Sequence, residues 1–459
     1  MTAFNTAWHA VGGDPALASR ASSVVRRGAL EARLPVRELA RACVGASALA
    51  AAELGARRAG LAEVPAVGVD DGAVAAAFHS ERLLQVDGRT PVSFAPLSRF
   101  WRTADGWVRT HANYPHHRAR LLGALGLPAD ASADEVARRL AERSALEVEE
   151  AVYRAGGLAV ALRTSKEWAA HEQAAEVVAR PLVERERLDS AHARVLPPLD
   201  RAAAPLLPAA GLRVLDLTRV LAGPVATRTL ALLGADVLRV DAPQLSELAD
   251  QHADTGFGKR SATVDLTTDR DTFEELLASA DVVVTGYRPG ALDRFGLSPE
   301  ALAGRRPGLV VAQVSAWGAY GPWGGRRGFD SLVQVASGIA VTEGSADQPG
   351  ALPAQALDHG TGYLLAAAVL RAVTEQSYDS GSRLVRLALA RTARWLTDEI
   401  RPGPATGAAA YEGPDAWLAE TDSPLGRLRH ALPPVSFAGG PADWARPPVP
   451  WGSDPARWA

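Results

Sequence analysis

The chain has 459 residues and a net charge of -3, with 47% hydrophobic and 22% charged residues. This composition is ordinary for a globular protein, and the length is enough for two or three domains with a sizeable core. The small negative charge excludes the broad basic surface that nucleic-acid binding needs. The single cysteine, Cys43, excludes an internal disulfide and a cysteine-based metal site, and it fits the reducing cytoplasm.

No membrane or secretion signal stands out in the sequence. The N-terminal residues lack the basic-then-apolar order of a signal peptide. The Ala-rich stretch at 39–61 includes Arg41, Glu53 and Arg57, which would be costly inside a bilayer. We therefore expect an amphipathic helix there, and a cytoplasmic protein that does not bind a membrane.

The first part of the chain predicts pieces of a larger domain. Residues 1–30 are polar and without periodicity, which indicates an N-terminal arm. Residues 31–95 predict a helix, a strand and a second helix, a segment that we expect to complete the large domain. Residues 176–210 are rich in proline and predict a linker on the surface.

Residues 96–175 predict a small α/β domain. A strand-like segment, DGWVRTHAN, leads into a helix. Two more helices carry recognisable starts, after Ser132 and after Thr164, and Glu167 has the capping-box spacing from Thr164. These features predict a compact unit with its own short sheet.

A different pattern begins at Gly211, where short β-branched runs alternate with helical stretches. The expected strands are 213–217, 236–240, 281–285, 309–315 and 383–389. This alternation is typical of right-handed βαβ units and predicts a doubly wound, Rossmann-like parallel sheet over 211–400. Residues 401–459 are rich in Pro and Gly and predict an extended C-terminal segment.

An internal similarity is also visible. The Ala-rich helix at 44–60 resembles that at 361–373, and a strand and helix follow each. Two unrelated Ala-rich helices would look alike by coincidence. A true repeat would align Asp358 with Ala42, so the first copy would have lost that carboxylate.

Five motifs, in order, resemble class III (CaiB/BaiF-type) CoA-transferases. They are GLRVLDLTRVLAGPVATRTLALLGADVLRVD at 211–241, GKRSATVDL at 258–266, ADVVVTGYRPGALDRFGL at 280–297, PGLVVAQVSAWGAYGPWGGRRGFD at 307–330 and ALDHGTGYLLAAAVL at 356–370. In that family the small domain follows the nucleophile, whereas here it comes first. The resemblance therefore implies the family fold, an α/β large domain plus a small α/β domain, in permuted or partly duplicated order.

The resemblance implies that Asp358 is the catalytic nucleophile. A carboxylate can attack an acyl-CoA thioester to give a mixed anhydride, and CoA can return to form an aspartyl-CoA thioester that a carboxylic acid then accepts. Gly360 and Gly362 would let substrate approach the backbone. From the residues alone, the N-cap of a helix starting near Gly360 is the favoured role of Asp358, and a cap and a nucleophile can be the same residue.

The resemblance also implies a site for coenzyme A, which enters as a substrate and not as a permanently bound cofactor. The turn after the first strand would contact its adenine and pantetheine, and basic side chains would bind its phosphates, because arginine binds phosphate oxygens in pairs. The implied contacts are Val220, Leu221, Ala222, Lys259, Tyr287, Arg288, Arg294 and Arg327. The family also implies a homodimer.

Several alternatives stay open. Class III relatives include acyl-CoA racemases with a G-H-D motif, but this chain has Gly328-Phe329-Asp330, and phenylalanine cannot relay a proton. A catalytically inactive CoA-binding protein is a further possibility. A nicotinamide-dependent dehydrogenase is disfavoured because no G-x-G-x-x-G loop is present.

Three remaining features complete the expectations. The histidines His111, His116 and His117 lack carboxylate or cysteine support, so we expect no metal site. The Gly-rich run at 317–328 predicts a mobile cover over the active site. The acyl group and the acceptor acid are not specified by any residue.

Overall fold

A computed structural model describes residues 2–403 and 408–459. Its largest element is a seven-stranded sheet with the order β11-β10-β9-β12-β13-β14-β8. The strands are β8 (Glu184–Arg187), β9 (Arg213–Leu217), β10 (Asp236–Asp241), β11 (Arg260–Thr263), β12 (Val282–Thr285), β13 (Val310–Ser315) and β14 (Arg383–Ala388). All neighbours are parallel except β14 and β8. The predicted parallel sheet and its five expected strands are confirmed.

Two strands of this sheet were not expected. β11 forms one edge, and β8, which lies within the stretch predicted as a linker, forms the other. β8 has the sequence ERER and pairs with β14 on one side only. An edge strand needs few apolar residues, and charged side chains protect such an edge from further pairing. The usual alternation of a strand is therefore missing here.

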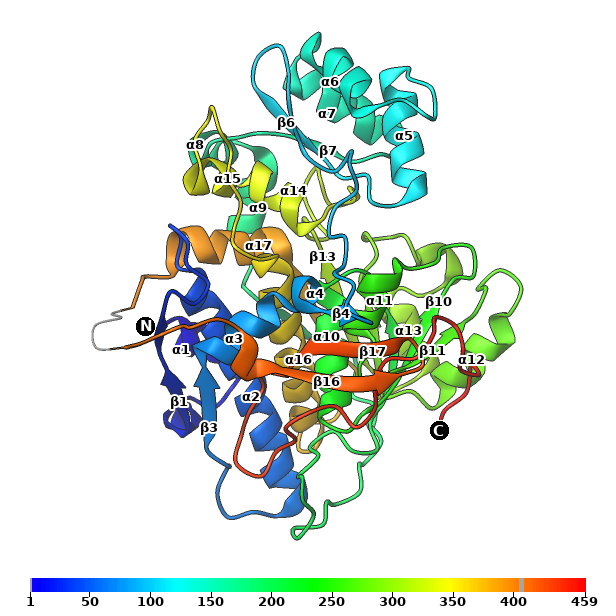
Figure 1. Cartoon of the computed structure of the whole chain (residues 1–459). Helices are drawn as coiled ribbons and strands as arrows, with labels where there is room; N and C mark the ends of the chain where they lie inside the picture. Colours follow the sequence, from blue (N-terminus) through cyan, green and yellow to red (C-terminus); the bar gives the residue numbers. More distant parts are fainter. Residues whose placement is uncertain (1, 404–407) are drawn as a thin grey trace.

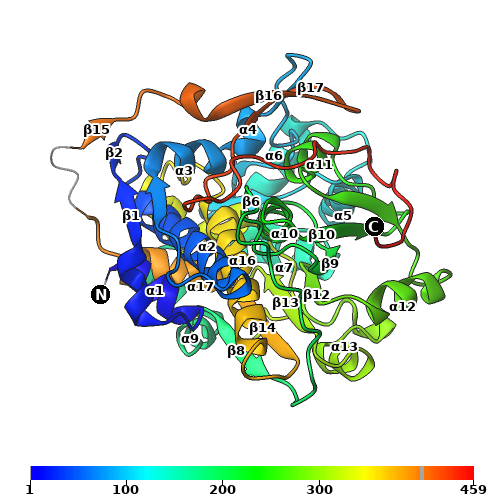
Figure 2. The same ribbon diagram turned by 90° about the horizontal axis from the view of Figure 1, so that it is seen from below.

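Helices cover both faces of the sheet (Figures 1 and 2). On one face, α2 (Val36–Ala59), α10 (Ala222–Leu232) and α16 (Ala356–Gln376) pack in the main core with Val214 and Val282. On the other face, α12 (Arg270–Ala278) and α13 (Pro299–Arg305) cover a second core. Alternate residues of the central strands enter the two cores, as Val214 and Leu215 of β9 do.

Helix α2 is long and apolar enough to span a membrane by length and composition, but 89% of its most apolar stretch is buried inside the protein. It is a core helix instead of the amphipathic helix expected from its charges. Those charges have partners, since Arg41 binds Asp71 at 2.6 Å and Glu53 binds Arg371 at 2.5 Å. Pairing lets charged positions approach the core without a large desolvation cost.

The two ends of the chain are more structured than expected. The predicted N-terminal arm contains α1 (Ala3–Ala10) and β1 (Ala21–Val24), and β1 pairs with β3 (Val67–Asp70). The predicted extended C-terminus contains a hairpin of β16 (Leu418–Ser423) and β17 (Gly426–Ala431) that pairs with β4 (Gln85–Val86). Other short elements are β2 (Arg26–Arg27), α3 (Asp71–Phe78), α4 (Ser80–Leu83), α11 (Ala249–Thr255) and β15 (Ala409–Ala410).

The unit between 96 and 175 lies at one end of the molecule (Figure 1). Its antiparallel sheet has the order β5 (Phe100–Arg102), β6 (Trp107–Thr110) and β7 (Ala159–Ala161). Its helices are α5 (Pro115–Leu125), α6 (Ala133–Ala141), α7 (Ala145–Arg154), α8 (Ser165–Ala169) and α9 (Glu172–Val178). The capping box at Thr164 is confirmed, and Ser132 forms another with Glu135. The helices α14 (Asp330–Ala336), α15 (Ile339–Glu343) and α17 (Leu389–Arg394) lie between this unit and the large sheet.

Candidate active site

The site begins where the order of the sheet reverses, between β9 and β12. Parallel α/β sheets bind ligands at the carboxyl ends of the strands beside such a point. The turn after β9 contains Val220, which has φ 72° although it is not glycine. Its N–H donates to Glu247 Oε2 at 3.2 Å, which helps to hold this unusual backbone. Strained backbone of this kind often lies at functional sites.

The buried carboxylate of Asp216 stabilises the turn that follows β9. Asp216 on β9 accepts hydrogen bonds from the Thr218 N–H at 3.0 Å and from Lys259 Nζ at 2.9 Å. Lys259 is 2% exposed, and burial lowers its pKa to about 8. The structure therefore does not bring Lys259 to the cleft, where a phosphate contact was expected. Ala222, the first residue of α10, is also buried behind the turn.

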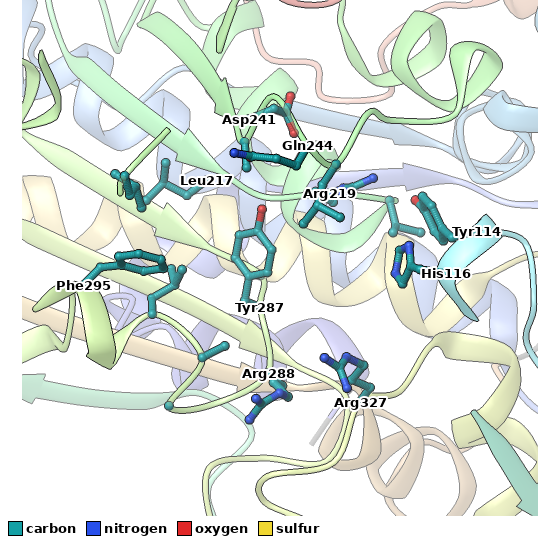
Figure 3. A pocket seen from close by; sticks show the side chains of 18 of the residues that line it. Tyr114, His116, Leu217, Arg219, Asp241, Gln244, Tyr287, Arg288, Phe295 and Arg327 are labelled. Atoms are coloured by element: carbon teal, nitrogen blue, oxygen red, sulfur yellow. The ribbon is translucent and has the colours of Figure 1, made fainter. Parts of the chain in front are cut away.

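A cleft of about 780 Å³ opens in front of the turn. Tyr287 stands in the middle of it, between Phe295 on one side and Tyr114 and His116 on the other (Figure 3). Arg288 and Arg327 lie near one another along one rim. Of the expected contacts, the cleft gathers Val220, Tyr287, Arg288, Arg294 and Arg327.

Several arginines of this cleft have no carboxylate partner. Within residues 2–403 and 408–459, no ion pair is formed by Arg120, Arg288, Arg294 or Arg327. Burial lowers the pKa of Arg327, and the charges of Arg120 and Arg288 lower it further. Arg294 lies exposed at the rim, with its guanidinium 4.6 Å from the Phe295 ring. Converging, unpaired arginines suit the phosphates of a nucleotide.

The small unit and the large sheet meet at the floor of this cleft. Glu247 accepts a hydrogen bond from the Tyr114 hydroxyl at 2.5 Å and pairs with Arg239 at 3.0 Å. Burial opposes the charge of Glu247, but Arg239 and then Arg219 lower its pKa to about 2. Glu247 is therefore an anion, and it fixes Tyr114 and Arg219 against the strand ends.

A second cavity, of about 440 Å³, contains Asp358. Val220 and Phe329 line both this cavity and the larger cleft. Its other walls include Glu81 on α4, Leu221 in the turn and His111 at the end of β6. The cleft and the Asp358 cavity therefore adjoin at Val220 and Phe329.

The structure excludes the N-cap interpretation of Asp358. Helix α16 starts at Ala356 with Gln355 as its N-cap, so Asp358 lies inside the first turn. The backbone N–H groups of Leu357 and Asp358 donate to Asp330 Oδ2 at 2.9 and 3.1 Å. Asp330 therefore accepts the free N–H groups at the start of the helix, and the Asp358 carboxyl lines the cavity.

The electrostatics around Asp358 are unusual. Burial raises the pKa of Asp358 well above its ordinary range, and the charges of Asp330 and Glu81 raise it further. Burial also raises the pKa of Asp330, to about 6. Carboxyl groups this close titrate as a pair, and their proton is held at higher pH than an exposed aspartate would hold it.

His359 does not act on Asp358 directly. Its Nε2 lies 3.1 Å from Glu81 Oε2, and its ring stacks on Phe78 with centroids 5.1 Å apart. Burial opposes the charge of Glu81, but the hydrogen bond and charge of His359 hold the pKa of Glu81 below its usual value. Glu81 comes from the N-terminal segment, and nothing in the local sequence marks it as a site residue.

Three histidines gather near the cavity but offer no metal site. Among the residues described, no group of His, Cys, Asp and Glu is arranged to hold a metal ion. Burial lowers the pKa of His111 to about 3 and that of His117 to about 2, so both are neutral. His111 stacks flat on Phe329, with ring centroids 3.8 Å apart and planes at 9°.

The Gly-rich loop at 317–328 is anchored, which does not fit the mobile cover predicted from its glycines. Trp317 and Trp323 are buried and pack edge to face, with centroids 4.7 Å apart. The buried Gln173 donates to the carbonyl groups of Trp317 and Tyr320 at 2.9 and 3.1 Å, and accepts from the Trp323 N–H at 2.8 Å. The tryptophans between the glycines give the loop a core of its own.

Comparison with known proteins agrees with this description. The model of CoA-transferase family III matches residues 209–410. The chain is 33% identical over 238 residues to a probable fatty acyl-CoA transferase of Mycobacterium tuberculosis, covering 46% of this chain and 60% of that protein. It is 33% identical over 193 residues to the formyl-CoA:oxalate CoA-transferase of Streptomyces coelicolor, covering 39% and 47%. The chain spans about half the length of the curated relatives it matches.

Solved structures give similar matches. A crystal structure of the Mycobacterium tuberculosis protein is 36% identical, with a TM-score of 0.39, covering 42% of this chain and 56% of that one. A CaiB/BaiF family protein from Brucella suis is 29% identical, with a TM-score of 0.38, covering 43% and 60%.

The sheet, the cleft at its switch point and the buried carboxylate beyond it define an α/β protein with a nucleotide-sized site. Residues 209–410 match the model of CoA-transferase family III, so this part of the chain resembles that family. The order of its small and large domains relative to that family stays a prediction.

Proposed function

We propose that the protein is a class III acyl-CoA:carboxylate CoA-transferase with Asp358 as its nucleophile. The observation that carries the proposal is that two cavities lie side by side. The arginine-lined cleft and the Asp358 cavity share Val220 and Phe329 as walls. Coenzyme A joins a charged nucleotide to a reactive thiol by a long, flexible arm, which fits this arrangement.

In this scheme the nucleotide lies in the larger cleft. Arg288 and Arg327 contact its phosphates, Arg294 contributes from the rim, and Tyr287 stacks on the adenine. The pantetheine arm passes Val220 and Leu221 toward Asp358. Lys259 acts only indirectly, because its ammonium is held by Asp216 at 2.9 Å below the turn. No permanently bound cofactor is needed.

The reaction then proceeds by exchange on Asp358. The ionised carboxylate attacks the thioester carbon, the C–S bond breaks, and a mixed anhydride and free CoA thiolate result. The thiolate attacks the Asp358 carbonyl, forms an aspartyl-CoA thioester and releases the first acid. The carboxylate of the acceptor acid attacks this thioester, and CoA thiolate then attacks the new anhydride at the acceptor's carbonyl. A new acyl-CoA leaves, and Asp358 is a carboxylate again.

We also propose that the protein is a cytoplasmic homodimer. Its similarity to the family supports a dimer, and its single, buried cysteine suits a reducing compartment. Sedimentation at micromolar concentration tests the dimer. A species with the mass of one chain throughout would contradict it.

The direct test of the activity is mass spectrometry of the protein with a panel of acyl-CoA thioesters. The expected result is an added acyl or CoA mass on the peptide that contains Asp358, and none in Asp358→Asn. A modified wild-type protein that carries the mass on another residue would move the chemistry away from Asp358. The thioester that reacts would also identify the acyl group.

A further inference from the structure

Three neutral polar side chains that line the cavity around Asp358 and that the reaction scheme has not used, His111, Gln251 and Ser331, have a buried atom without a partner among the residues described. Of these, His111 and Ser331 are buried as whole residues, whereas Gln251 is partly exposed. His111 is 5% exposed, and its Nδ1 has no hydrogen-bond partner among the residues described. Ser331 is 7% exposed, and its Oγ also has no partner in that part of the chain. Both residues line the cavity with Asp358. Buried polar groups nearly always have partners, so an unpartnered donor such as the Ser331 hydroxyl needs an explanation.

The backbone on both sides of His111 is held firmly. Before it, the Thr110 hydroxyl accepts from Trp101 Nε1 at 2.8 Å. After it, the Ala112 N–H donates to Ser98 Oγ at 2.7 Å. The N–H of His111 itself donates to the Leu158 carbonyl at 3.2 Å. A group held in this way needs little rearrangement during a reaction.

Ring packing restricts the imidazole as well. One face lies on Phe329 with ring centroids 3.8 Å apart, and the edges of Phe94 and His117 approach with centroids at 6.4 Å. Nδ1 is buried without an acceptor, and an orphaned N–H is the rarer kind of unpaired group. We therefore assign the proton of the neutral ring to Nε2, where it can serve as a donor.

The cavity has no free cation for a developing negative charge. Arg89 is the only arginine or lysine among its lining residues in the described chain. It is bound to Asp250 at 3.0 Å. Glu81, Asp330 and Asp358 add negative charge to the same walls. An oxyanion formed here would therefore depend on neutral hydrogen-bond donors.

From this arrangement we propose that His111 and Ser331 are a donor pair for the thioester carbonyl oxygen. The inference rests on the proposed transferase activity of Asp358. When Asp358 attacks, the carbonyl π electrons move to oxygen, and the His111 N–H and Ser331 O–H donate hydrogen bonds to it. No proton is transferred. The oxyanion collapses, the C–S bond breaks, and CoA leaves as the thiolate.

The test compares the rate of acyl-adduct formation on Asp358 in wild type and variants, by rapid quenching and mass spectrometry. His111→Phe keeps the ring stack and removes the donor. It should slow adduct formation by roughly 100- to 1000-fold, the usual effect of losing one oxyanion donor. His111→Gln restores a donor and should recover part of the rate. Ser331→Ala should slow the step by about tenfold or more.

Binding and folding are followed in the same variants. CoA affinity should stay unchanged in His111→Phe, because the nucleotide lies in the other cleft, and thermal unfolding reports the fold. His9→Phe, an exposed histidine on α1, is the matched control and should behave as wild type.

Each contrary outcome has a distinct meaning. A wild-type adduct rate in His111→Phe would overturn the inference alone. Loss of CoA affinity and rate together would show a structural role instead. If deuterium exchange at the acyl α-carbon depends on His111 while adduct formation does not, the imidazole transfers protons and the donor role is wrong. Absence of any adduct in wild type would overturn both the inference and the proposed function.

Discussion

Asp330 and Asp358 are joined by a hydrogen bond from the backbone N–H of Asp358 to Oδ2 of Asp330, at 3.1 Å. The same oxygen accepts the N–H of Leu357 at 2.9 Å. The Asp330 carboxylate thus orders the start of α16, the helix that contains Asp358. The arrangement places two buried acids together, and their proximity raises the pKa of Asp358 beyond the effect of burial.

The first prediction concerns the nucleophile. Asp358→Asn keeps the shape of the side chain but cannot form an anhydride, because an amide is a poor nucleophile. The variant should fold and bind CoA, and its transfer rate should fall by at least about 1000-fold, as when other covalent nucleophiles are removed. Steady-state transfer assays and CoA titration measure this. Asp347→Asn, an exposed carboxylate, is the control. Normal turnover of Asp358→Asn would rule out this mechanism.

The second prediction concerns the pH dependence of activity. Attack on the thioester requires that Asp358 is ionised, and the negative charge of Asp330 raises the pKa of Asp358. Asp330→Asn removes that charge and retains an amide oxygen that can accept the two backbone N–H groups. The acidic limb of kcat/KM should therefore move to lower pH, by about one unit or more. An unchanged limb, or one moved to higher pH, would show that Asp330 does not control the titration.

The third prediction concerns stability. The pKa of Asp330 is about 6 in the folded protein, above its unfolded value, and that of Asp358 is raised too. The native state therefore holds more protons, and the free energy of unfolding falls as pH rises from about 4 through about 6. Asp358→Asn cannot ionise, so it should unfold a few degrees above wild type at pH 8 and at the same temperature near pH 4. Thermal unfolding at both pH values tests this, and an equal shift at both would refute it.

Much of the large domain could be predicted from local sequence. The β-branched runs at 213–217 and 282–285 alternate with helical stretches, and they are buried from both faces, so their pattern is strong. The start of α16 was placed near Gly360, four residues beyond Ala356. Its first-turn N–H groups are satisfied by Asp330, a residue distant in the sequence, and no local capping signal marks that start.

The candidate site was harder to predict because several members come from distant segments. Glu81 and His111 precede the matched family motifs and reach Asp358 only through the fold. Lysine is a residue type that often binds phosphate, but the ammonium group of Lys259 is bound by the buried carboxylate of Asp216. Sequence alone cannot show whether the ammonium group of a lysine will bind a ligand phosphate or a carboxylate of the protein. The anchoring of the 317–328 loop depends in the same way on Gln173.

The fourth prediction concerns CoA binding. Arg327→Gln should weaken CoA binding roughly 10- to 150-fold, since a charge-assisted contact is worth about 1.5–3 kcal/mol. Arg294→Gln should have a smaller effect, because Arg294 is exposed at the rim and solvent screens it. Wild-type affinity should fall with added salt. Calorimetric titration measures all three. Arg118→Gln on α5 is the control, because Arg118 does not line the cleft. Equal losses in Arg118→Gln and Arg327→Gln would contradict the assignment.

The last prediction concerns the loop at 317–328. Gln173 is fully buried and joins α9 to this loop through hydrogen bonds to Trp317, Tyr320 and Trp323. Gln173→Leu keeps most of the volume but leaves three backbone groups without partners. Each buried, unpaired group costs about 1–3 kcal/mol, so the free energy of unfolding should fall by several kcal/mol.

Chemical denaturation measures this loss, and limited proteolysis should show new cleavage between 317 and 328. Gln348→Leu, at an exposed position, is the matched control and should show neither change. Because Trp317 Nε1 also donates to the Arg327 carbonyl at 3.1 Å, the freed loop should carry Arg327 away from the cleft. CoA affinity should then fall in Gln173→Leu as well. Lower stability with unchanged CoA affinity would show that Arg327 is positioned independently of the loop's tryptophan core.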